Sequence, residues 1–131
     1  MESRTPLLLV VDDDPLVRDM AADALARHGY RVITAGDGAE AVALFARETT
    51  GIAMVITDMK MPRMDGNALA QVLQDLQPGL RLLAMSGQAV GPHAPHTDRF
   101  GDAVIYKPFK IPALVREVRR VLGADPVAAT P

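Results

Sequence analysis

The chain has 131 residues and a formal net charge of −2, with 14 Lys and Arg against 16 Asp and Glu. This length predicts a single domain, and the balanced charge argues against nucleic acid or an anionic membrane surface as a direct partner. The absence of cysteine excludes thiol catalysis, thiolate metal sites and disulfides. The longest aliphatic run is too short to cross a bilayer and no signal-type segment precedes it, so we expect a soluble, cytoplasmic protein.

That aliphatic run, residues 7–11, shows no alternation of apolar and polar residues, which is typical of a strand covered on both faces. It ends at three consecutive aspartates. A helix is predicted to follow, because Asp14 can cap its first turn, Pro15 suits that turn, and Gly29 can end it. Apolar residues at helical spacing predict its buried face: Val17, Met20, Ala21, Ala24 and Leu25.

Two more strand–helix units follow. Residues 31–35 and 52–57 predict the second and third strands. Asp37 and Glu40 stand at the spacing of a capping box at the start of the helix between them. The third strand leads through a loop to Gly66 and a third helix. The predicted inner faces are Ala41, Leu44 and Phe45 in one helix, and Leu69, Val72, Leu73 and Leu76 in the other.

The segment 87–101 breaks this alternation. Residues 80–85 and 103–106 predict the fourth and fifth strands, so a fourth helix is expected between them. Residues unfavourable in helices occupy that place: Gly91, Pro92 and Pro95. We therefore predict that this helix is short, displaced or absent.

A final helix begins near Pro112, with Leu114, Val115, Val118, Val121 and Leu122 as its predicted buried stripe. Five strands alternating with helices predict an α/β fold, with a doubly wound parallel sheet between two helix layers. The domain is expected to span residues 1–123, and residues 124–131 to form a flexible tail or linker stump.

Polar residues follow four of the predicted strands at their ends: Asp12 and Asp13, Asp58, Ser86 and Lys107. The fold should bring them to one edge of the sheet, where such sheets bind ligands. Neighbouring carboxylates repel by on the order of a few kcal/mol per pair, so positive charge is expected there. Oxygen ligands without thiolate or imidazole favour Mg²⁺, and three carboxylates, Mg²⁺ and one lysine sum to zero charge.

Four motifs in this order resemble the receiver domain of bacterial two-component response regulators. They are Val10-Val11-Asp12-Asp13-Asp14-Pro15, the segment Asp-Met-Lys-Met-Pro-Arg-Met-Asp-Gly from Asp58 to Gly66, Met85-Ser86-Gly87, and Tyr106-Lys107-Pro108-Phe109. The resemblance covers residues 7–122 and implies a flavodoxin-like (βα)₅ fold with three α/β/α layers.

The resemblance implies that Asp58 accepts a phosphoryl group from a sensor histidine kinase or a histidine phosphotransfer protein. Lys107 and Ser86 would contact phosphoryl oxygens, and Gly87 would leave the line of attack open to water. The implied ligands of Mg²⁺ (or Mn²⁺) are Asp12, Asp13, Asp58 and the backbone carbonyl of Lys60.

The resemblance also implies a switch and a means of tuning it. Ser86 would move toward the phosphoryl group while Tyr106 rotates inward, which alters the face built from the expected fourth helix, the fifth strand and the last helix. Lys60 and Gln88 occupy positions that flank the phosphoryl group and tune its lifetime. A cis peptide bond between Lys107 and Pro108 is expected as well.

Other functions were weighed against this one. The chain could be a receiver-like interaction module that does not use phosphorylation, although every required side chain is present. A Mg²⁺-dependent phosphatase with an Asp nucleophile fits the spacing of Asp12 and Asp14 only formally, and leaves Asp58 unexplained. We expect no enzyme activity beyond phosphorylation and dephosphorylation of the chain's own Asp58. Phosphorylation-dependent homodimers are common in the family, and the oligomeric state is left open.

Overall fold

The computed structural model describes residues 5–48, 51–87, 91–92 and 94–123. Within these ranges, five parallel strands form one sheet in the order β2-β1-β3-β4-β5. The strands are β1 (Leu7–Val11), β2 (Arg31–Ala35), β3 (Met54–Asp58), β4 (Arg81–Ser86) and β5 (Val104–Tyr106). The helices are α1 (Pro15–Arg27), α2 (Gly38–Arg47), α3 (Gly66–Leu76) and α4 (Ile111–Val121), with a short 3₁₀ helix, η1 (Asp98–Phe100).

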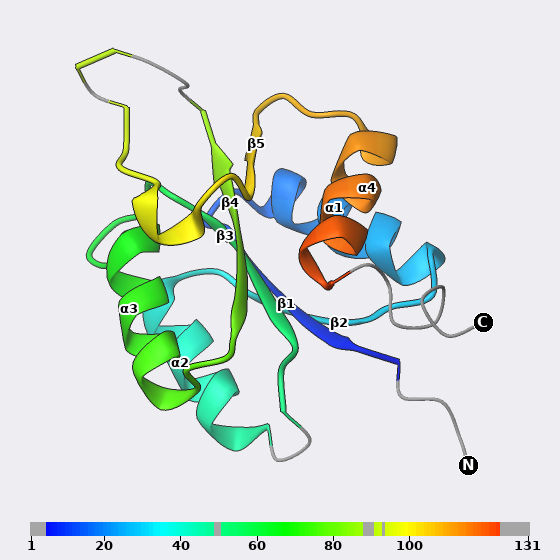
Figure 1. Cartoon of the computed structure of the whole chain (residues 1–131), viewed down its shortest axis with the longest axis horizontal. Coiled ribbons are helices and arrows are strands. Elements are labelled where there is room, and N and C mark those ends of the chain that lie inside the picture. Colours follow the sequence, from blue (N-terminus) through cyan, green and yellow to red (C-terminus); the bar gives the residue numbers. More distant parts are fainter. Residues whose placement is uncertain (1–4, 49–50, 88–90, 93, 124–131) are drawn as a thin grey trace.

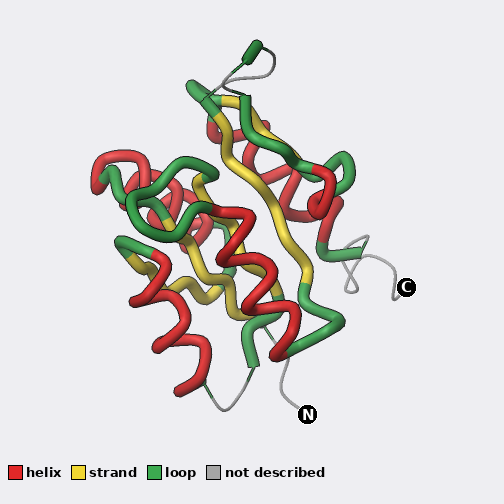
Figure 2. Tube along the Cα trace, turned by 90° about the vertical axis from the view of Figure 1, so that its left-hand side faces the viewer, coloured by secondary structure: helices red, strands yellow, loops and turns green. Residues whose placement is uncertain are grey.

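Helices cover both faces of the sheet. In Figure 1, α2 and α3 lie on one side of the strands, and α1 and α4 lie on the other. Figure 2 views the α2 and α3 side, with these helices in front of the strands. This arrangement confirms the predicted doubly wound α/β fold. No helix in the described part of the chain combines the length and the apolar character needed to cross a membrane.

The sheet separates two hydrophobic cores, and β1 contributes to both. Leu7, Leu9 and Val11 pack into the core under α2 and α3. Leu8 and Val10 point the other way, into the core under α1 and α4. All five side chains of β1 are therefore buried, which explains why the strand is a continuous aliphatic run without alternation.

Three aspartate caps begin the helices that leave the sheet edge. Asp14 accepts a hydrogen bond from the amide of Leu16, Asp37 from Glu40, and Asp65 from Ala68, at 2.8–2.9 Å. The capping box at α2 differs from the prediction. Glu40 accepts from the amide of Gly36 at 2.7 Å instead of that of Asp37, so its carboxylate binds the backbone one residue before the helix cap.

Some predicted core positions are wrong. Met20 is 42% exposed, because α1 buries a narrower stripe of Ala21, Ala24 and Leu25. Val72 and Leu76 are exposed as well, since burial of α3 is centred on Leu69, Ala70 and Leu73. The alternating strand and helix pattern was correct, but the third, fourth and fifth strands each begin one or two residues later than predicted. Ile52, Leu80 and Ala103 are nevertheless buried just before those strands.

The segment between β4 and β5 contains no α-helix among its described residues, as predicted. Residues 94–100, here called the strap, run beside α3 and include η1 (Figure 1). Phe100 at the end of the strap is buried in the core under α2 and α3. One aromatic side chain thus covers part of the sheet face where a fourth helix would otherwise pack.

Gly66 allows α3 to start directly against the end of β3. Its amide donates to the carbonyl oxygen of Met59 at 3.0 Å. A Cβ atom at Gly66 would lie 2.6 Å from the carbonyl oxygen of Asp58 and 2.9 Å from the Cα of Met59. Both neighbours are backbone atoms, so they cannot move aside cheaply.

We therefore expect Gly66→Ala to lower the free energy of unfolding by at least about 2 kcal/mol, measured by urea denaturation. Gly79→Ala is the matched control, because a Cβ there meets nothing within 4 Å. It should change stability by less than about 1 kcal/mol. Equal effects of the two substitutions would show that the contact between Gly66 and the β3 end does not constrain the fold.

Candidate functional site

Four strand ends bring the predicted polar residues together at the carboxyl edge of the sheet. Asp12 and Asp13 follow β1, and Asp58 is the last residue of β3. Ser86 ends β4, and Lys107 follows β5. Because β1 and β3 are neighbours although α1, β2 and α2 separate them in sequence, Asp58 lies beside the first acidic pair. This reversal of strand order is the usual position of a ligand site in such sheets.

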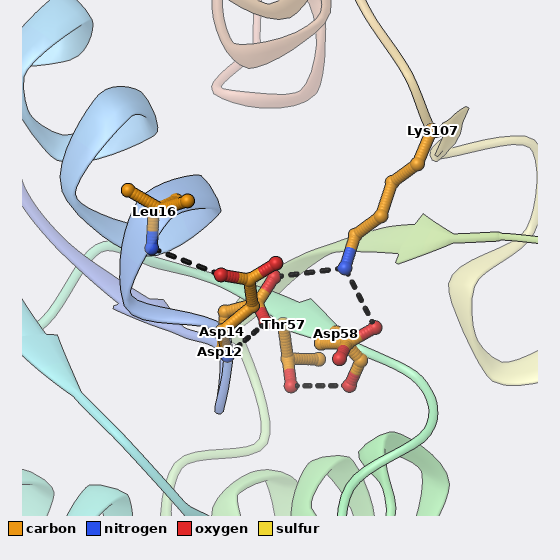
Figure 3. Close-up of polar contacts among 6 residues, drawn as sticks. All are labelled: Asp12, Asp14, Leu16, Thr57, Asp58 and Lys107. Atoms are coloured by element: carbon orange, nitrogen blue, oxygen red, sulfur yellow. Dashed lines mark hydrogen bonds and ion pairs between the residues drawn. The ribbon is translucent and has the colours of Figure 1, made fainter.

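Lys107 connects two of the carboxylates. Its Nζ lies 2.9 Å from Oδ2 of Asp12 and 3.2 Å from Oδ1 of Asp58 (Figure 3). The other oxygen of Asp12 accepts a hydrogen bond from the amide of Asp14 at 2.9 Å. Asp12 is completely buried and Asp58 is 7% exposed. One ammonium group therefore balances part of the negative charge of two buried carboxylates.

The three carboxylates also form a set that fits a divalent cation. One oxygen each from Asp12, Asp13 and Asp58 can be chosen so that all three lie within 4.8 Å of one another. Asp13 is exposed, whereas the other two are buried. Oxygen atoms are the ligands that Mg²⁺ and Mn²⁺ prefer, so the donor set fits the predicted ion. The net charge of this set and Lys107 is −2, which such an ion would neutralise.

The surroundings of Asp58 raise its pKa to about 6, since burial penalises the charged carboxylate and Asp12 repels it. Lys107 opposes this shift through its charge and hydrogen bond, and Asp13 adds to it. Burial works against the ammonium form of Lys107, but the hydrogen bond and charge of Asp12, followed by those of Asp58, outweigh it and raise its pKa. Asp58 is therefore ionised above about pH 6 while Lys107 keeps its proton.

A pocket of about 220 Å³ opens at this edge. Its lining consists of Asp58, Lys60, Ser86, Gly87, Pro95 and Lys107. A water molecule takes up about 30 Å³ of liquid, so this volume admits a small tetrahedral group together with water. Asp58 is the only member of the acidic cluster that lines the pocket within the described part of the chain.

The remaining predicted residues occupy different places. Lys60 is exposed and lines the pocket. Tyr106 is 44% exposed on β5 and is the register partner of Ser86, which is buried. Gln88 lies outside the described residues, as does the predicted tail at 124–131. The peptide bond between Lys107 and Pro108 is cis, as expected.

Sequence reasoning missed two residues next to the site. The hydroxyl of Thr57 donates to the carbonyl oxygen of Asp58 at 2.9 Å, and Thr57 is completely buried (Figure 3). A polar residue inside an aliphatic strand, directly before Asp58, was the available signal. Pro95 was interpreted only as a helix breaker, although it lines the pocket. No local pattern could have placed it there, because it comes from a separate segment.

An α/β domain with an acidic cluster and a lysine at the carboxyl edge of its sheet matches a known class of signalling domain. The chain matches the response regulator receiver domain family over residues 8–119. It therefore belongs to this family, whose members are generally regulators rather than enzymes.

Individual relatives are similar over most of the chain. TcrX of Mycobacterium tuberculosis, a probable transcriptional regulatory protein, is 34% identical over 116 residues, which are 88% of this chain and 49% of TcrX. The chain thus spans about half the length of that relative. CpdR of Brucella abortus, a response regulator receiver protein, is 33% identical over 118 residues, covering 89% of this chain and 97% of CpdR. A CheY-like receiver domain protein from Methanospirillum hungatei JF-1 has a TM-score of 0.82 at 26% identity, covering 95% of this chain and 99% of that one.

The raised pKa of Asp58 predicts a pH-dependent gain in stability for Asp58→Asn. The folded state favours the protonated acid, so wild-type stability falls as the pH rises from about 4 to about 6. Without metal, we expect the variant to be more stable than the wild type at pH 7.5 by about 2 kcal/mol, measured by urea denaturation. The difference should shrink toward pH 4.

Asp14→Asn serves as the control, because Asp14 is an exposed cap whose role asparagine can also fill. Its difference from the wild type should stay small across the same pH range. A stability gap for Asp58→Asn that does not change with pH would contradict the assigned ionisation.

Proposed function

We propose that the chain is a phosphoacceptor switch in a two-component phosphorelay. Asp58 would accept a phosphoryl group from a phosphohistidine of a sensor histidine kinase or of a phosphotransfer protein. One observation carries this proposal: Asp58 both lines the pocket and contacts Lys107, whereas Asp12 and Asp13 lie outside the lining. The carboxylate that the pocket exposes is the one available to an incoming phosphoryl group.

The transfer needs alignment and charge balance more than a strong base. An oxygen of Asp58 bonds to phosphorus while the phosphorus–nitrogen bond of the donor breaks, and the electron pair stays on the leaving imidazole. Lys107 lies 3.2 Å from Asp58, close enough for its ammonium group to pair with an oxygen of the transferred group. Ser86 lines the same pocket and supplies a hydroxyl to another oxygen.

Asp12, Asp13, Asp58 and the backbone carbonyl of Lys60 would hold Mg²⁺ or Mn²⁺. When bound, this ion would offset the negative charge of the incoming phosphoryl group. Asp12 also orients Lys107, through their contact at 2.9 Å, so the ammonium group stays directed at the pocket. Lys60 flanks the phosphoryl site from the pocket lining and would tune its lifetime together with Gln88.

Phosphorylation would reach the output face through Ser86 and Tyr106. These residues are paired in register on β4 and β5, with Ser86 buried and Tyr106 44% exposed. A hydrogen bond from Ser86 to the phosphoryl group would favour the state in which Tyr106 turns inward. The surface beside β5 and α4 would then change. The cytoplasmic location stays a prediction.

Incubation with Mg²⁺ and acetyl phosphate tests the proposed function. We expect one label that is stable in acid and labile in base, mapped to Asp58 by mass spectrometry. Asp58→Asn should lose the label because the accepting oxygen is gone. Asp14→Asn should keep it, because that cap residue does not line the pocket.

Two results would contradict this proposal in different ways. A folded wild-type chain that takes no label would favour an interaction module independent of phosphorylation. Continuous turnover with label on Asp12 would favour a phosphatase.

The cation site predicts stabilisation by Mg²⁺, since a ligand that binds only the folded state favours it by mass action. We expect 10 mM Mg²⁺ to raise the melting temperature by a few degrees, which corresponds to a gain of roughly 1 kcal/mol in the free energy of unfolding. Asp13→Asn should reduce this gain while preserving the fold, because Asp13 is exposed. A melting temperature that Mg²⁺ leaves unchanged would argue against the site.

A further inference from the structure

We propose that Pro95 is a positioning residue of the phosphoacceptor pocket, held over it by the hydrogen bond between Asn67 and the strap, and that it limits the access of water to phosphorylated Asp58. This inference rests on the proposed function. Pro95 forms a wall of the pocket, and this wall comes from the strap instead of from the strand ends or the loop after β3.

Pro95 differs from the rest of the pocket lining in origin and chemistry. The other lining residues lie at the ends of β3, β4 and β5 or directly after them: Asp58, Lys60, Ser86, Gly87 and Lys107. Pro95 is the sole contribution of the strap among the described residues. A proline ring carries no charge and no N–H donor, so the ring itself offers no hydrogen bond to a water molecule.

Three contacts fix the strap against the body of the domain. Phe100 is buried in the core under α2 and α3. The guanidinium of Arg99 donates to the side-chain carbonyl of Gln74 on α3 at 3.1 Å. The amide nitrogen Nδ2 of Asn67 donates to the backbone carbonyl of His96 at 2.7 Å. The last contact holds the residue that directly follows Pro95.

The start of α3, which contains Asn67, lies between the strap with Pro95 and the strand end with Asp58 along the chain of contacts. Asn67 directly follows Gly66, whose backbone packs against the carbonyl of Asp58 so closely that a Cβ atom would clash at 2.6 Å. The same first turn of α3 therefore contacts both the end of β3, through Gly66, and the strap, through Asn67. The start of α3 thus fixes the position of the strap, and with it Pro95, relative to the end of β3.

Access of water decides how long a phosphoryl group would stay on Asp58. In hydrolysis, a water oxygen bonds to phosphorus, the bond from phosphorus to the Asp58 oxygen breaks, and its electron pair returns to the carboxylate. The proton of the water leaves with inorganic phosphate or passes to solvent. An apolar wall reduces the number of waters that reach the line of attack, and displacing it should speed this step.

Loss of the phosphoryl group tests this inference. The wild type and its variants are labelled with acetyl phosphate and Mg²⁺, separated from the donor, and followed by the decay of phosphorylated Asp58. Asn67→Ala removes the hydrogen bond to the strap, and Pro95→Gly removes the ring. Both should lose the label about three- to tenfold faster than the wild type, as expected when a positioned group is displaced.

Gln71→Ala is the matched control, because Gln71 is an exposed residue one turn beyond Asn67 on α3. Its decay rate should equal that of the wild type. Melting temperatures measured in parallel separate a change in pocket access from a loss of folding. Pro95→Gly tests the wall directly if Asn67→Ala proves unstable.

The outcomes distinguish this inference from the proposed function. If the wild type takes label on Asp58 but Asn67→Ala and Pro95→Gly release it at the wild-type rate or more slowly, the role of Pro95 is overturned while phosphoacceptance stands. If Gln71→Ala accelerates the decay as much as Asn67→Ala, the effect belongs to α3 in general and the inference also fails. A folded wild type without label overturns the proposed function itself.

Discussion

The arrangement of the site depends on one cation between two buried carboxylates. Lys107 contacts Asp12 and Asp58 at 2.9 and 3.2 Å, and without it two buried negative charges would face each other with no positive side chain between them. Even with it, burial and the charge of Asp12 raise the pKa of Asp58 to about 6. The cluster thus keeps a residual negative charge, which gives a divalent ion or a further positive group a reason to bind.

Strand pairing, a helix cap and a close backbone contact hold these groups in place. The β1–β3 neighbour relation places Asp12 beside Asp58, and a cap at Asp14 starts α1 immediately after the acidic residues. Gly66 lets α3 start against the carbonyl of Asp58. Backbone contacts of this kind leave the loop after β3 little freedom. On the proposed function, such rigidity would help to align Asp58 with an incoming phosphoryl group.

The strap is irregular, yet it contributes one residue to the hydrophobic core and one to the pocket lining. Gly91, Pro92 and Pro95 disfavour a regular helix between β4 and β5, and the described residues of that segment contain no α-helix. Phe100 covers part of the core there. Pro95, from the same segment, lines the pocket.

The sequence by itself determined the alternation of strands and helices, the caps, and the set of polar residues at the strand ends, because periodicity and capping act over a few residues. It misplaced Met20 and Leu76, since helical spacing alone does not show how wide a buried stripe is. Only the tertiary structure decided which partners meet. Lys107 contacts Asp12 across 95 residues, and Pro95 lines the same pocket as Asp58 although the local pattern of its segment indicates only a missing helix. Such contacts follow from the packing of the whole sheet and its helices, which no short stretch of sequence encodes.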